Sequence, residues 1–244
     1  MKKIFKRTLI ITGIIIGVLV LAWGIIFFKI YSETSGFATL ETGKVVDGIY
    51  VVKDDFSNCF FIQDETQYIV IDCANNQKVV AEQMKILGIS PDRVTAVLLT
   101  HTDGDHVGAL GLFGKAKLYI SREEEQMTNG KKSKFLWFGT SIPRKDYILL
   151  EDRQTMHLGN LKVECFLVPG HTSGMMAYLI NDRYLFTGDI ASLKEGKIAP
   201  IPSIFDMDTQ LAAKSREIIR RIPTAEYILT AHWGYTDDYK TAVR

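Results

Sequence analysis

A long uncharged segment near the start of the chain limits what this sequence can form. Residues 8–28 contain no charged side chain and consist mainly of Ile, Leu, Val, Phe and Gly. At about 1.5 Å per residue, a helix of that length covers the roughly 30 Å of a bilayer core. We therefore expect residues 1–31 to form a short cytoplasmic tip and one transmembrane helix, and the rest to fold separately.

The charges before this segment predict its orientation. The stretch Met1–Arg7 holds four basic residues and no acid, and such residues stay on the cytoplasmic side of a membrane. This pattern predicts a single-pass membrane protein whose C-terminal domain is extracytoplasmic. A cleaved signal peptide is the alternative, but its apolar stretch is usually about 7–15 residues long and ends in small residues. Here the run ends in Phe27 and Phe28.

The rest of the sequence is expected to contain a linker, residues 32–42, and one domain, residues 43–244. Of the 29 basic residues, five precede residue 32, which leaves 24 against 28 acidic residues. A domain with that balance has no general attraction to phosphate backbones, so nucleic acid is not an expected partner. The length suits one compact domain with a sizeable core and is short for two.

Strands outnumber helices in this domain. Runs rich in Val, Ile, Phe and Tyr predict strands, and apolar residues at three-to-four spacing predict helices. Strands are expected at residues 44–52, 58–62, 68–72, 94–100, 116–120, 147–150, 161–168, 176–180, 183–187 and 226–230, and helices at 76–88, 121–128 and 209–222. Residues 129–146 have little periodicity and are interpreted as an insertion. Helices do not alternate one for one with strands, which favours an α+β fold with packed sheets and helices outside.

Several chemically distinctive residues receive ordinary structural interpretations. The cysteines Cys59, Cys73 and Cys165 lie in strand-like surroundings and are expected to be buried core residues. His157 is interpreted as structural. The run Arg122–Glu125 is interpreted as a solvated helix face.

Four of the five histidines follow expected strands or lie in glycine-flanked loops. They are His101 and His106 in Thr-His-Thr-Asp-Gly-Asp-His, His171 in Pro-Gly-His-Thr-Ser-Gly, and His232 in Thr-Ala-His-Trp-Gly. Asp103 and Asp105 lie within the first string, and Asp189 follows the strand ending in Thr187-Gly188. Strand ends present side chains to a shared cleft, and imidazole with carboxylate is a donor set of zinc, iron and manganese. The pattern predicts a metal site.

The order of these motifs resembles the metallo-β-lactamase superfamily. Its matching parts are Asp72 at the end of an early strand, the string from His101 to His106, then His171, Asp189 and His232. The resemblance covers residues 43–244. It implies a four-layer αββα sandwich, here preceded by the transmembrane helix, with metal bound at the edge between the sheets.

The resemblance also implies two divalent metal ions and a role for each motif residue. The first ion would be held by His101, Asp103 and His171, and the second by Asp105, His106 and His232. Asp189 would bridge the two ions. Asp105 would also orient the attacking water, and Asp72 would hold the ligands in place from behind. Zinc is favoured. The usual string of the family is His-x-His-x-Asp-His, and an acid at position 103 shifts the preference toward iron or manganese. Because aspartate is also short, a loose, differently metallated or empty first site remains open.

A metal-activated water implies hydrolysis of a small ester, thioester, lactone or phosphoester. His106, where the best-known zinc β-lactamases have arginine, makes the chain similar to the glyoxalase II and lactonase branches and argues against antibiotic hydrolysis. Two alternatives stay open: a di-iron redox enzyme, suggested by Asp103, and a tethered, non-catalytic binding protein. Trp233 and Tyr235 are expected in the substrate cleft, and Trp137 either there or in the core. The substrate and the oligomeric state are not determined by the sequence.

Overall fold

The computed structural model describes residues 2–34, 36–129, 131–134, 142 and 144–244. It divides the chain into two compact units, Met1–Phe37 and Ala38–Arg244. The first unit contains helix α1 (Lys2–Thr34), which extends into the range expected as linker. Its segment Lys6–Lys29 is long and apolar enough, by length and composition, to cross a membrane.

The second unit begins with a seven-stranded sheet whose strands lie side by side in chain order, β1 to β7. The first four strands pair antiparallel, and β4, β5, β6 and β7 then pair parallel. The strands are β1 (Gly43–Val46), β2 (Ile49–Lys53), β3 (Asn58–Asp64), β4 (Gln67–Ile71), β5 (Val94–Leu98), β6 (Lys117–Ser121) and β7 (Tyr147–Leu150). Helix α2 (Gln77–Ile86) is capped by Asn76 and buries Val80 and Met84. These two side chains belong to the core on one face of this sheet.

A second sheet has the order β15-β14-β11-β10-β9-β8, in which only β11 and β14 run parallel. Its strands are β8 (Thr155–Leu158), β9 (Leu161–Leu167), β10 (Met176–Ile180), β11 (Tyr184–Gly188), β14 (Tyr227–Thr230) and β15 (Tyr235–Thr236). The helices α5 (Thr209–Ile219) and α6 (Tyr239–Ala242) pack on its outer face through Ala212, Ile219 and Tyr239. A hairpin, β12 (Ser192–Lys194) and β13 (Lys197–Ala199), lies between β11 and α5 in the chain.

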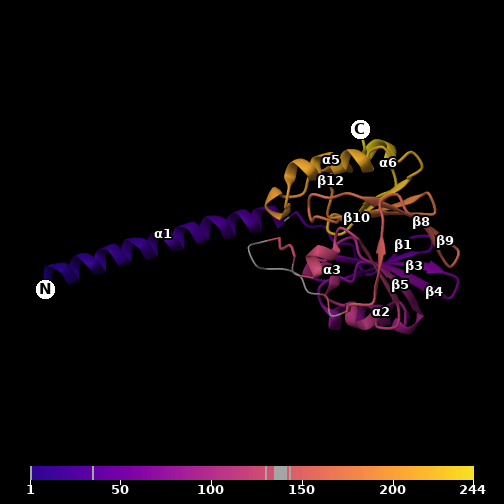
Figure 1. Cartoon of the computed structure of the whole chain (residues 1–244), viewed down its shortest axis with the longest axis horizontal. Coiled ribbons are helices and arrows are strands. Elements are labelled where there is room, and N and C mark those ends of the chain that lie inside the picture. Colours follow the sequence, from indigo (N-terminus) through magenta and orange to yellow (C-terminus); the bar gives the residue numbers. More distant parts are fainter. Residues whose placement is uncertain (1, 35, 130, 135–141, 143) are drawn as a thin grey trace. The chain divides into compact units, whose positions relative to one another are not determined.

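The inner faces of the two sheets pack on each other and form the central core. Phe60 of β3 and Phe186 of β11 meet edge to face, with ring centroids 5.3 Å apart, and both belong to one buried cluster drawn from the two sheets. Figure 1 shows α2 and α5 on opposite outer sides of the sheets. The layer order is helix, sheet, sheet, helix, which confirms the predicted four-layer α+β sandwich.

Short elements account for most differences from the sequence-based expectation. The strand expected at residues 44–52 is two strands, because Gly48 has a φ of +76° and turns the chain. The helix expected at residues 121–128 is shortened to α4 (Glu125–Thr128), because Ser121 still belongs to β6. Additional short elements are α3 (Gly104–Val107), β8, β12, β13, β15 and α6. Such segments are too short to show a period, so hydropathy alone does not reveal them. The three cysteines are buried, as predicted, and all three are free.

Candidate metal centre

The topology brings the predicted site residues to one edge of the sandwich. Asp72 follows β4 and His101 follows its parallel neighbour β5, while Asp189 follows β11 and His232 follows its parallel neighbour β14. The carboxyl ends of parallel strands meet at the same edge of a sheet, which is where ligands bind in such sheets. Helix α3 adds Asp105 and His106 to this edge.

Three groups of potential ligand atoms occur at this point, and within each group the atoms all lie within 4.8 Å of one another. They are His101, Asp103 and His171; His101, His106 and Asp189; and Asp105, His106 and His232. All seven side chains predicted as ligands are therefore brought together. We refer to His101, Asp103 and His171 as the first set, and to Asp105, His106 and His232 as the second set. Their duty as ligands remains a prediction.

Asp189 contacts both sets. Its Oδ2 atom lies 3.6 Å from Nε2 of His106 and 3.6 Å from Nε2 of His171, and its Oδ1 atom lies 3.3 Å from Nε2 of His232. In the second set, Nε2 of His232 is 3.2 Å from Oδ2 of Asp105. One carboxylate thus faces both sets, which is the geometry expected of a bridging group.

Hydrogen bonds behind the site orient two of the imidazoles. Oδ2 of Asp72 lies 2.9 Å from Nδ1 of His106 and accepts a hydrogen bond of 2.7 Å from the Thr100 hydroxyl. The Thr100 oxygen in turn lies 3.0 Å from Nδ1 of His101. A partner at Nδ1 sets the tautomer and aims Nε2 at the site. Asp72 therefore orients His106 directly and His101 through Thr100.

The other two imidazoles differ at Nδ1. His232 donates from Nδ1 to the backbone carbonyl of Phe56. Nδ1 of His171 faces Oδ1 of Asp206, whose side chain is 3% exposed, but the 3.6 Å between them is too long for a hydrogen bond, and neither atom has another hydrogen-bond partner among the described residues. Asp206 was not predicted from the sequence, because nothing in the string Ile-Phe-Asp-Met distinguishes it from an ordinary loop acid.

Buried atoms at the centre lack hydrogen-bond partners within the described part of the chain. These atoms are Nε2 of His101, Nε2 of His106 and Oδ1 of Asp189. Burying a polar atom without a partner is costly. Inward-facing imidazole nitrogens beside a carboxylate oxygen are the donors of a zinc site, so the residues fit a divalent metal ion.

The electrostatics of the centre also favour a cation. Burial alone lowers the pKa of His232, but Asp189 and Asp105 outweigh it and raise this pKa to about 10. Burial also lowers the pKa of His106, but nearby carboxylates including Asp72 raise it well above its ordinary value. His101 differs, since burial and the neighbouring His106 lower its pKa to about 4. The carboxylates thus stabilise positive charge around the second set, whether it is carried by a proton or by a metal ion.

Lys134 reaches the first set and was not predicted. Its ammonium donates to Oδ2 of Asp103 and, over 2.8 Å, contacts Nε2 of His171. The Lys134 side chain is only 8% exposed. It comes from the segment interpreted as an insertion, where several lysines occur without a pattern that singles one out.

Glu124 corrects the interpretation of residues 122–125 as a solvated helix face. Its side chain is buried and accepts hydrogen bonds from the backbone and hydroxyl of Thr102, at 2.9 and 2.8 Å. Its other oxygen accepts from the Thr172 hydroxyl at 2.7 Å and from the backbone of Gly174 at 3.1 Å. One carboxylate therefore links the loop of His101 to the loop of His171. A charged run alone does not show which member turns inward.

The aromatic residues predicted for the cleft have different outcomes. The Trp233 ring lies 5.4 Å from the His232 ring, edge to face. Tyr235 is on β15 and 40% exposed. Trp137 lies outside the described residues. Phe56, which was not predicted, stacks on His232 at 6.2 Å and is 37% exposed.

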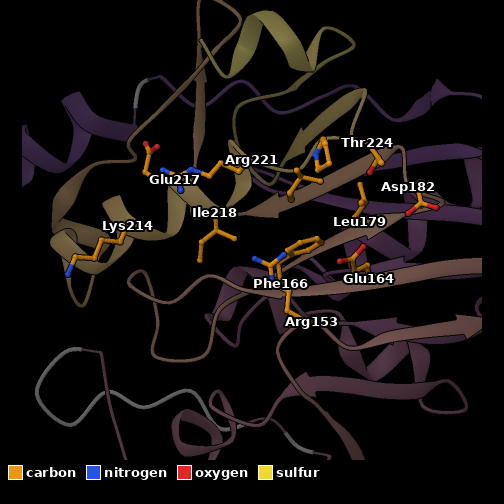
Figure 2. Close-up of a pocket in the computed structure, with 12 residues that line it drawn as sticks. Arg153, Glu164, Phe166, Leu179, Asp182, Lys214, Glu217, Ile218, Arg221 and Thr224 are labelled. Atoms are coloured by element: carbon orange, nitrogen blue, oxygen red, sulfur yellow. The ribbon is translucent and has the colours of Figure 1, made fainter.

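A cavity of about 480 Å³ lies elsewhere, between the outer face of the second sheet and α5. Figure 2 shows its lining, in which Arg153 lies beside Phe166, with the guanidinium 4.5 Å from the ring centroid. Acidic and basic side chains are mixed around it, and none of the predicted site residues lines it. We therefore assign the chemistry to the strand-end cluster and not to this cavity.

Comparison with known proteins agrees with this geometry. The family profile described as the metallo-β-lactamase superfamily matches residues 52–232. A metallo-β-lactamase family protein from Thermus thermophilus has a similar structure, with a TM-score of 0.65 at 16% identity, covering 82% of this chain and 78% of that chain.

Curated relatives carry hydrolase names. A probable metallo-hydrolase of Methanocaldococcus jannaschii is 25% identical over 168 residues, or 68% of this chain and 71% of the relative. A probable polyketide biosynthesis zinc-dependent hydrolase of Bacillus subtilis is 35% identical over 97 residues, 38% of this chain and 37% of the relative. A hydroxyacylglutathione hydrolase of Glaesserella parasuis is 34% identical over 134 residues, 53% of this chain and 48% of the relative. This chain therefore spans about half the length of the hydroxyacylglutathione hydrolase that it matches.

Proposed function

Since the chain belongs to the metallo-β-lactamase superfamily and is a metal-dependent hydrolase by that membership, we propose that it hydrolyses a small ester, thioester, lactone or phosphoester. The observation that carries this proposal is the buried cluster at the sheet edge, in which imidazole Nε2 atoms and three aspartates face one point. The hydrolase names of the curated relatives support it.

We propose zinc as the metal, with Asp105, His106, His232 and Asp189 as its ligands. A divalent ion held by these residues would lower the pKa of a coordinated water and would polarise the carbonyl or phosphoryl oxygen of the substrate. The orphaned Nε2 of His106 and Oδ1 of Asp189 support the assignment. The zinc-dependent relative supports the choice of metal.

Asp105 is proposed as the group that accepts a proton from the attacking water. Burial alone would raise the pKa of Asp105, but His106 and His232 outweigh burial and lower it to about 2. Its carboxylate is therefore ionised at neutral pH and can accept a hydrogen bond from water and then a proton. Asp72 and Thr100 keep the imidazoles beside it aligned.

Among the possible substrates, we favour a thioester. The hydroxyacylglutathione hydrolase of Glaesserella parasuis is named for a thioester-cleaving reaction and matches 53% of this chain. His106 at the end of the His101 string points to the same branch. The ring of Trp233 beside His232 offers an apolar wall for the acyl or thiol part of such a substrate.

The test is a hydrolysis panel with the full chain purified in detergent micelles, using thioester, ester, lactone and phosphoester substrates. We expect thioester hydrolysis that is lost on chelation and restored by zinc. His106→Ala and Asp189→Ala should abolish turnover, whereas His157→Ala, exposed on β8, should retain it. Wild-type turnover in H106A would contradict the assignment, and hydrolysis restricted to another member of the panel would replace the thioester by that substrate class.

A further inference from the structure

We propose that the ammonium of Lys134 takes the place of the first metal ion, so that the chain binds a single divalent ion, in the second set with Asp189. This inference rests on the proposed function, since it assumes that the centre binds metal. It concerns the number of ions and the group that fills the first set.

The first observation is the position of the lysine nitrogen. Nζ of Lys134 contacts Oδ2 of Asp103 and lies 2.8 Å from Nε2 of His171. These are two of the three atoms that the first set offers to a metal. An ammonium and a metal ion cannot both bind Nε2 of His171 at the same time, because this nitrogen has only one lone pair.

The second observation is the charge of the first set. Asp103 stands where the usual string has a histidine, and only a carboxylate supplies the negative charge that pairs with a buried ammonium. The side chains of Lys134 and Asp103 are 8% and 20% exposed, so this pair is largely removed from water. A divalent ion added there would lie within a few ångströms of the ammonium, where repulsion between cations is strong. The buried ammonium therefore gives a physical reason for an acid at position 103.

The carboxylates of Asp105 and Asp189 have no lysine or arginine partner within the described part of the chain. Among those residues, they form ion pairs only with the imidazoles of the cluster. Nε2 of His106 and Oδ1 of Asp189 have no hydrogen-bond partner there. Metal binding is therefore expected where no ammonium already occupies the position beside the carboxylates.

The lysine also replaces part of what a first metal would do. An ammonium has three N–H donors, and contacts with Asp103 and His171 use two of them among the described residues. The third can donate to a substrate oxygen that gains negative charge in the transition state. The centre would then combine one metal ion with one fixed ammonium.

The experiment is a measurement of bound zinc per chain by mass spectrometry of the metal. The full-length protein in detergent micelles is equilibrated with excess zinc and then freed of unbound ion. We expect one zinc ion in the wild type and two in Lys134→Met, which keeps the length of the side chain and removes its charge. Lys134→Arg and the exposed neighbour variant Lys131→Met should each retain one.

Each outcome separates this inference from the proposed function. Two zinc ions in the wild type, or one in folded Lys134→Met, would overturn the inference and leave the hydrolase proposal standing. No zinc in any of the proteins would overturn both. If Lys134→Met does not fold, the counts in the wild type and Lys134→Arg still decide, since two ions in either contradict the proposal.

Discussion

Single hydrogen bonds behind the imidazoles decide which nitrogen faces the site. Asp72 is central, because its two oxygens accept from the Thr100 backbone, the Thr100 hydroxyl and Nδ1 of His106. Asp72 also has a φ of +56°, which an aspartate tolerates better than most residues. Its backbone conformation and its hydrogen bonds together fix the Asp72 carboxylate at the start of the loop that follows β4.

Asp72→Asn is expected to weaken zinc binding by about 10-fold to 100-fold, the usual effect of losing a group that orients a metal ligand. The amide presents one oxygen and one NH₂ group to three donors, so at least one of them loses its acceptor. The measurement is zinc competition with a chelating dye. Asp92→Asn, exposed and paired with Lys115, is the control. Wild-type affinity in D72N would show that Asp72 does not orient the ligands.

The pH dependence of metal binding follows from the pKa of His232. In the metal-free protein Asp189 and Asp105 overcome the effect of burial and raise this pKa from 6.5 to about 10. A metal ion must therefore displace a proton from His232 at neutral pH. Zinc affinity should rise between pH 6 and 8 by about tenfold per pH unit for each proton released. Calorimetry in buffers of different ionisation enthalpy measures that release, and a pH-independent affinity would contradict the prediction.

The same raised pKa gives a stability prediction of definite sign for the metal-free protein. Protonated His232 stabilises the folded state fully below pH 6.5, its ordinary value, and this contribution is lost as the pH rises toward 10. Zinc should reduce this dependence, because the metal replaces the proton. Urea unfolding with chelator and with zinc, across this pH range, compares the two states. A metal-free stability that increases over this range would contradict the sign.

At the scale of elements, the proposed ligands lie on loops that follow strands and on the four-residue helix α3. The loop after β9 packs so tightly on the start of α4 that a Cβ at Gly174 would lie 2.0 Å from the backbone nitrogen of Glu124. The same loop is tied to the buried Glu124 carboxylate. The position of His171 is therefore determined by contacts with a distant part of the chain.

Gly174→Ala is expected to lower the free energy of unfolding by about 1–3 kcal/mol, because the added methyl group overpacks this contact. Gly114→Ala is the matched control, since a Cβ there meets nothing within 4 Å. Urea denaturation of the metal-loaded full chain, with zinc content measured in parallel, compares the two. Equal stability of both variants would show that the loop relaxes without cost.

At the scale of the whole molecule, an apolar helix and a metal-binding domain share one chain. The side chains described within Lys6–Lys29 are exposed, and the segment has the length and composition of a membrane span. We propose that it anchors the protein and that the domain lies outside the cytoplasm, because the basic residues come before the span.

A reporter fused after Arg244 tests this orientation. An alkaline phosphatase fusion should be active, because this enzyme requires an extracytoplasmic location. A green fluorescent protein fusion should be dark, because this protein fails to fold after export in unfolded form. Replacing the four basic residues of Met1–Arg7 by glutamate should reduce phosphatase activity. Bright fluorescence from the wild-type fusion would place the domain in the cytoplasm.

The sequence alone determined the apolar span, most strands, the fold class and the strand-end residues from Asp72 to His232. These follow from local composition and from the order of motifs. Hydrophobic periodicity reports which side chains must be buried, and a strand end is visible wherever that periodicity stops at a polar string such as His101–His106.

Only the tertiary structure decided which side chains complete the centre. Lys134 meets Asp103, Glu124 joins Thr102 to Thr172, and Asp206 faces His171, all across long separations in sequence. A lysine in an aperiodic segment and a glutamate in a charged run have no local signature of burial. Their positions depend on how loops from different strands pack at one edge, because the partners of a side chain in a loop are set by distant backbone and not by its neighbours in the chain.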